Sequence, residues 1–188
     1  MLLTLLSIAS AHDLDIGLLA RVADTQAQTP VQRLGFSAQG IYRAEVGDFR
    51  VRGLAFPWSL DGFGQSARIT GAGLLGYERS LPMAGAFSFA PGLDISRGFF
   101  VVDSGLACDQ SCRKRNLAYT PKGTLYWSGP ELSLSASVGL GILHASTDAR
   151  FYPASKLALH HSSGAWVSAE MGEVRGLSAV NAGWRWSR

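Results

Sequence analysis

The chain has 188 residues, of which 47% are hydrophobic and 16% are charged, and its formal net charge is +3. This length fits one domain, and no run of about 18 apolar residues exists to form a spanning helix. The chain also lacks a basic tract long enough to predict a nucleic-acid partner. Glycine is abundant, at 22 residues, and no segment keeps the 3.6-residue apolar spacing of an amphipathic helix. The composition therefore predicts an all-β protein.

Residues 1–11, MLLTLLSIASA, have a short apolar core followed by Ala9-Ser10-Ala11, which resembles a signal-peptidase cleavage site. The segment lacks the Lys or Arg that normally opens a secretory signal. We interpret it as the end of a signal peptide, with an ordinary apolar first strand as the alternative. Residues 12–188 would then form the mature domain.

Ten segments alternate apolar with polar residues, as expected for β-strands, whose successive side chains point to opposite faces. In chain order they are residues 14–22, 33–45, 49–53, 67–78, 85–95, 116–127, 132–142, 151–161, 165–171 and 176–187. The last three are weaker candidates, although residues 176–187 again alternate, and eight strands are the alternative if two of the weaker ones are not barrel strands. The pattern predicts an antiparallel up-and-down β-barrel.

The predicted connections alternate between short and long. Short turns are expected at Gly47-Asp48, Leu81-Pro82 and Ser128-Gly129-Pro130. Longer links are expected near residues 24–31, 58–65, 96–114 and 144–152. Short turns at one end and longer loops at the other are typical of outer-membrane barrels.

Two kinds of barrel fit this alternation. In a soluble, lipocalin-like carrier the apolar face points inward, whereas in a transmembrane barrel it meets lipid. The polar faces here are rich in Ser, Gly, Thr and Arg, and the charged fraction is well below the roughly 25–35% of a soluble surface. The apolar face also carries aromatic residues near one end, which predicts an interfacial belt: Tyr42, Phe49, Tyr77, Phe87, Trp127, Trp184 and Trp186. Both observations favour the transmembrane barrel.

Charged residues share the polar face of the predicted strands. An Arg or Lys facing lipid at the bilayer midplane costs about 2–4 kcal/mol, so in a membrane these groups must point inward. The positive set is Arg21, Arg33, Arg43, Arg50, Arg52, Arg68, Lys122, Lys156 and Arg185. The negative set is Asp13, Asp15, Glu45, Glu78, Asp94 and Glu170. Their pairing in a narrow lumen predicts a closed polar interior rather than an open pore.

The C-terminal segments Ala165-Trp166-Val167-Ser168-Ala169-Glu170 and Ser178-Ala179-Val180-Asn181-Ala182-Gly183-Trp184-Arg185-Trp186 resemble the end of the small outer-membrane β-barrel superfamily, the porin-family or OmpA-like barrels. The resemblance implies location in the bacterial outer membrane, contact with outer-membrane lipid and lipopolysaccharide, and recognition by the barrel-assembly machinery. We expect a monomer without cofactor, metal or nucleic acid.

A second resemblance is to the outer-membrane lipid A 3-O-deacylases, through Leu159-His160-His161-Ser162-Ser163-Gly164. It implies His160 as base, Ser162 as nucleophile and Glu173 as orienting acid. Residues i and i+2 share a strand face, so an imidazole could activate the hydroxyl. The alternative is ordinary turn chemistry.

The longest predicted loop contains Cys108, Cys112 and the cationic run Arg113-Lys114-Arg115. In an exported protein the two cysteines are expected to form a loop-closing disulfide. The three cations could bind lipopolysaccharide phosphates, since Arg can hold a phosphate bidentately. A solvated charged loop is the alternative.

The sequence thus predicts a small outer-membrane barrel with a structural, adhesive or surface-interaction role through its extracellular loops. A lipid A hydrolase and a soluble exported ligand-binding barrel are the two alternatives.

Overall fold

The computed structural model describes residues 12–24, 33–59, 70–100, 117–144, 149–172 and 177–187. Its strands are β1 (Asp13–Asp24), β2 (Arg33–Ala44), β3 (Gly47–Ser59), β4 (Thr70–Glu78), β5 (Leu81–Pro82), β6 (Phe87–Phe100), β7 (Leu117–Ser128), β8 (Leu132–His144), β9 (Ala149–His161), β10 (Ala165–Met171) and β11 (Leu177–Ser187). Among these residues there is no helix of the length and hydrophobicity that a membrane crossing requires.

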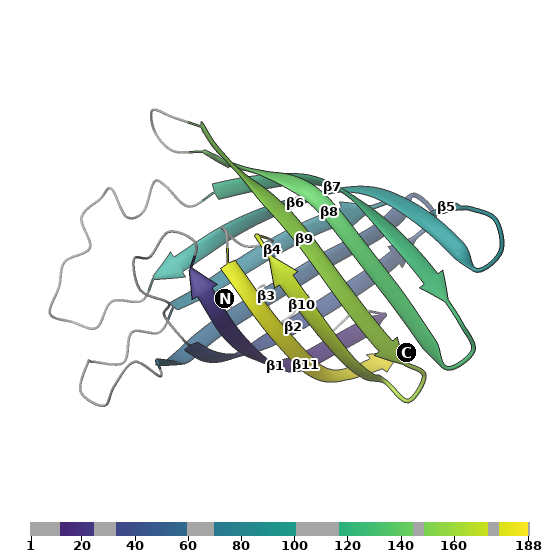
Figure 1. The fold of residues 1–188 in the computed structure, drawn as a ribbon, viewed down its shortest axis with the longest axis horizontal. Coiled ribbons are helices and arrows are strands. Elements are labelled where there is room, and N and C mark those ends of the chain that lie inside the picture. Colours follow the sequence, from purple (N-terminus) through teal and green to yellow (C-terminus); the bar gives the residue numbers. More distant parts are fainter. Residues whose placement is uncertain are drawn as a thin grey trace, which may run out of the picture.

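Ten of these strands form one closed antiparallel barrel, which confirms the predicted fold class and strand number. Each strand pairs with its neighbour in the chain, β4 pairs with β6, and β1 closes the wall by pairing with β11. The strands run at a slant around the wall (Figure 1). Because the wall is closed, the ten strands have no free sheet edge. The two-residue β5 lies outside this ring and pairs only with β6.

The described connections gather at one end of the barrel, called here the short-turn end, at the right of Figure 1. They comprise residues 45–46, the segment around β5, residues 129–131 and residues 162–164. Asp13 pairs with Ser187 at the same end. The remaining connections lie outside the described residues.

Two of the predicted turns were misplaced by a few residues. The first turn is residues 45–46 rather than Gly47-Asp48, because Gly47 already pairs with Ala44 as the first residue of β3. Gly47 has φ of 143°, and a Cβ there would meet the Glu78 carbonyl. In the second case Leu81-Pro82 is a short strand, and the chain turns at residues 84–86, where Gly85 has φ of 68°.

The two faces of the wall differ as the alternation predicts. Every barrel strand presents at least one large exposed apolar side chain, such as Leu18, Leu75 and Val138. The inward residues are mostly polar, and many are buried, such as Asp94, Thr120 and Asn181. The repeat around residues 132–142 follows this rule, since Val138 and Leu140 are exposed while Ser137 is buried.

A glycine pair allows the closure between β1 and β11. Gly17 and Gly183 are register partners, and Trp166 of β10 is the next partner of Gly183. A Cβ on Gly183 would overlap the Ile16 carbonyl and the Gly17 Cα, whereas a Cβ on Gly53 would meet nothing within 4 Å. Only glycine fits at position 183 without a backbone shift.

We therefore predict that Gly183→Ala destabilises the barrel while Gly53→Ala does not. Overpacking of this kind costs about 1–3 kcal/mol. The measurement is guanidinium unfolding followed by circular dichroism, with Gly53→Ala as the matched control. Equal unfolding midpoints for the two variants would contradict the role of Gly183 in closure.

Candidate functional site

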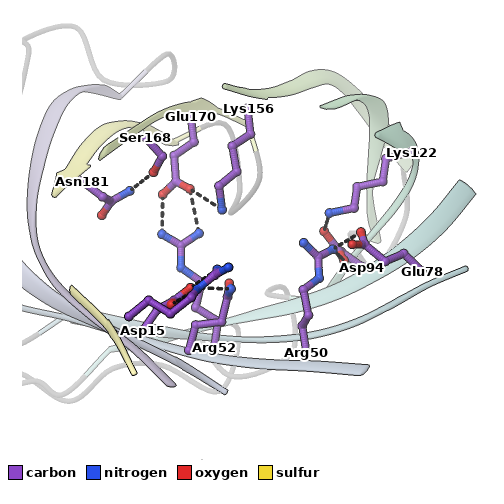
Figure 2. A network of polar contacts seen from close by, with 12 residues as sticks. Asp15, Arg50, Arg52, Glu78, Asp94, Lys122, Lys156, Ser168, Glu170 and Asn181 are labelled. Atoms are coloured by element: carbon purple, nitrogen blue, oxygen red, sulfur yellow. Dashed lines mark hydrogen bonds and ion pairs between the residues drawn. The ribbon is translucent and has the colours of Figure 1, made fainter. Parts of the chain in front are cut away.

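The candidate site is the polar lumen, which holds two groups of ion pairs (Figure 2). The first group centres on Glu170 of β10. The Arg52 guanidinium donates to both Glu170 oxygens, at 2.7 and 2.9 Å, and the Lys156 Nζ lies 3.8 Å from Oε2. Arg52 is on β3, four positions from β10 around the wall, so this bidentate pair joins opposite sides of the barrel.

The second group centres on Asp94 of β6. Its carboxylate accepts a hydrogen bond from Arg50 at 2.9 Å and forms an ion pair with Lys122, whose Nζ lies 2.6 Å from Oδ2. Arg50 also lies 3.3 Å from Glu78, which accepts from the Tyr126 hydroxyl. A Cβ at Gly76 would fall against the Asp94 carboxylate, so the glycine leaves room for the pair.

Two more pairs lie nearer the short-turn end. Arg185 donates to both Asp15 oxygens, at 2.6 and 2.7 Å, and Arg43 pairs with Asp13. The Arg43 side chain is 62% exposed, as expected at a rim, whereas the Asp13 carboxylate is buried. The paired groups are thus arranged from the rim into the interior.

Four of the charged residues expected in the lumen lie elsewhere or have side chains outside the described residues. Glu45 lies in the exposed turn beyond β2, whereas Arg43 lines the lumen at its rim, as expected. The backbones of Arg21 and Arg33 are register partners on β1 and β2. The side chains of those two arginines, and Arg68 as a whole, lie outside the described residues.

An apolar cluster follows the ion pairs inside the lumen. It consists of Leu19, Leu54, Ala72, Leu74 and Ala179, all buried. Successive inward residues of β3 are Asp48, Arg50, Arg52 and Leu54, so the lining changes from charged to apolar with distance from the short-turn end. The inward leucines were not identified from the sequence. They could have been found from the alternation, because a Leu at every second position from polar residues shares their inward face. Leu19, for example, lies on the same face of β1 as Asp13, Asp15 and Gly17.

The structure separates the two residues of the predicted His160–Ser162 pair. His160 faces the lumen, and its Nδ1 is buried without a hydrogen-bond partner. Ser162 lies in the exposed turn, where its amide donates to the Glu131 carbonyl at 2.8 Å. The imidazole–hydroxyl pair at this turn is His161 Nδ1 with Ser163 Oγ, at 2.8 Å. Glu173 lies outside the described residues.

The other predicted sites, namely the signal segment 1–11, Cys108, Cys112 and the run Arg113-Lys114-Arg115, also fall outside the described residues. In the described part of the chain no three His, Cys, Asp or Glu side chains are placed to bind a metal ion. A scan against protein-family models finds no match, and a search of the curated proteins finds no similar protein.

We predict that Glu170→Gln lowers the free energy of unfolding by about 3–5 kcal/mol, because it leaves the buried Arg52 without its carboxylate. The measurement is the guanidinium unfolding midpoint, with the exposed Arg79→Gln as control, expected to change stability by about 0.5 kcal/mol or less. Adding Arg52→Gln to Glu170→Gln should recover part of the loss. A midpoint for Glu170→Gln equal to that of Arg79→Gln would contradict a structural role for the pair.

Proposed function

We propose that this protein is a small outer-membrane β-barrel that acts as a closed membrane anchor and presents its longer loops at the cell surface. The supporting observation is the apolar exterior, which continues around all ten strands. Soluble monomers rarely expose apolar patches above a few hundred Å². A soluble carrier also needs the reverse arrangement, with an apolar interior for its ligand.

Aromatic residues near the two ends of the exterior support the membrane proposal. Near the short-turn end, Phe49, Phe87, Trp184 and Trp186 are exposed, and Phe49 lies against Tyr77 with ring centroids 5.1 Å apart. Near the opposite end, Phe36, Tyr119 and Phe151 are exposed within a few residues of their strand ends. Aromatic girdles at both interfaces are typical of outer-membrane barrels.

The distance between these two aromatic groups suits a bilayer. On β7, Tyr119 belongs to the far group, and Trp127 lies at the short-turn end as the register partner of Phe87. The two residues are eight positions apart. At about 3.4 Å per residue this is about 27 Å along the strand. With the tilt of about 40° usual for such barrels, it corresponds to roughly 21 Å along the membrane normal, near the apolar band of about 25 Å.

The interior supports an anchor rather than a wide pore. The Arg52–Glu170 pair crosses the lumen, and the apolar cluster lies beyond it. A lumen occupied by fixed side chains leaves little room for a water-filled channel. We further propose that the loops make the surface interactions. In this proposal Arg113-Lys114-Arg115 contact lipopolysaccharide phosphates.

The first test is membrane insertion. The protein should fractionate with outer membranes and migrate anomalously on gels when unheated. Val138→Arg places a charge on the 70%-exposed outward position of β8, at a cost of about 2–4 kcal/mol if that position faces lipid near the midplane. Folded protein in the membrane should therefore decrease, with Val138→Leu as the matched control. Recovery of a soluble periplasmic monomer would rule out the proposal.

The second test is conductance in planar bilayers. The purified barrel should give no large steady current, because the ion pairs and the apolar cluster occupy the lumen. Glu170→Ala removes the acceptor of the cross-lumen pair and should increase the frequency of transient openings. A large steady current from the unaltered protein would be incompatible with a closed anchor and would favour solute passage.

A further inference from the structure

One charged side chain lies on the outer face of the barrel wall. On β6 the side chains of Ala90, Asp94 and Ser96 are buried in the lumen, so the residues at odd positions face outward. The outward residues of β6 are Phe87, Phe89, Pro91, Leu93, Ile95 and Arg97. Arg97 is exposed. Among the outward side chains that the structure describes on the ten barrel strands, it is the one Arg, Lys, Asp or Glu.

The position of Arg97 along β6 corresponds to a membrane interface. Phe87 lies at the short-turn end, as the register partner of Trp127, and Arg97 is ten residues farther along the strand. At about 3.4 Å per residue this is about 34 Å. With a strand tilt of about 40°, it corresponds to roughly 26 Å along the membrane normal, close to the apolar band of about 25 Å. An outward Arg costs about 2–4 kcal/mol at the midplane but only about 0–1 kcal/mol near an interface.

This interface is the one on the side of the longer loops. Arg97 lies toward the end of the barrel opposite the described short turns (Figure 1). Outer-membrane barrels have short turns in the periplasm and longer loops outside the cell. In that orientation Arg97 reaches the headgroups of the outer leaflet, where the phosphates of lipopolysaccharide are the anionic groups.

A second polar group lies beside Arg97 on the outer face. Tyr119 of β7 is the register partner of Ile95, which makes it a diagonal neighbour of Arg97, and it is 37% exposed. Diagonal neighbours in a sheet lie about 7–8 Å apart, within reach of long and aromatic side chains. A guanidinium can hold a phosphate bidentately, and a phenol hydroxyl can donate to the same group. On the other side, the register partner of Arg97 is Gly73 of β4, which has no side chain to occupy the surface.

We propose that Arg97 and Tyr119 form a binding site for a phosphate group of lipid A, the membrane-embedded part of lipopolysaccharide. In this arrangement the acyl chains lie along the apolar face of β6, over Leu93 and Ile95. The proposal rests on the proposed membrane location, and it adds the leaflet and the side chains that contact the lipid.

The test measures lipid binding by native mass spectrometry of the full-length protein refolded in detergent micelles. Bisphosphorylated lipid A, dephosphorylated lipid A and phosphatidylglycerol are titrated separately. Bisphosphorylated lipid A should bind saturably and more tightly than the other two. Equal binding of the dephosphorylated lipid would overturn phosphate recognition. Equal binding of phosphatidylglycerol would overturn the assignment to lipid A and favour a site for any anionic headgroup.

The matched variants are Arg97→Gln and Arg79→Gln, because Arg79 is exposed between β4 and β5 at the short-turn end. Arg97→Gln should weaken lipid A binding by about tenfold or more, as expected for loss of a charge-assisted hydrogen bond. Tyr119→Phe should weaken it less, Arg97→Lys should retain part of it, and Arg79→Gln should leave it unchanged. Equal affinities of Arg97→Gln and Arg79→Gln would overturn the proposal.

Gel mobility of unheated samples verifies that each variant is folded before lipid is added. Because the barrel is already folded in micelles, a failure to bind lipid A is distinct from a failure of the membrane proposal, which is measured by fractionation with outer membranes.

Discussion

The bidentate pair between Arg52 and Glu170 is the interaction on which the interior depends. It joins β3 to β10 across the lumen, and both side chains are almost fully buried. Burying a charge is costly unless the charge is paired and hydrogen-bonded. The buried Arg52 therefore requires Glu170 on the opposite side of the barrel. The pair crosses the lumen between a cavity at the short-turn end and the apolar cluster.

The same requirement explains the small residues beside the charges. Gly76 leaves room for Asp94 and Arg50, and Gly17 leaves room for the Trp166 indole. A ten-stranded wall encloses little space, so an inward glycine beside a long charged or aromatic side chain leaves that side chain room. The abundance of glycine thus follows from the packing of the lumen as well as from the turns.

The barrel has the opposite distribution of residues from a soluble protein, because its large apolar residues lie outside and its ion pairs lie inside. This inversion is the physical basis of the proposed membrane location.

The sequence by itself determined the ten strands and the face of most of their polar residues, because alternation in a strand has a period of two. It could not determine that Arg52 pairs with Glu170, which is 118 residues away. Alternation shows that a side chain points inward, but not how deep it lies in the lumen or which residue it faces. The register between paired strands determines both the depth and the partner. The inward leucines and the separation of His160 from Ser162 likewise came only from the closed barrel, in which Leu19, Leu54 and Leu74 reach the same depth and β9 ends at His161.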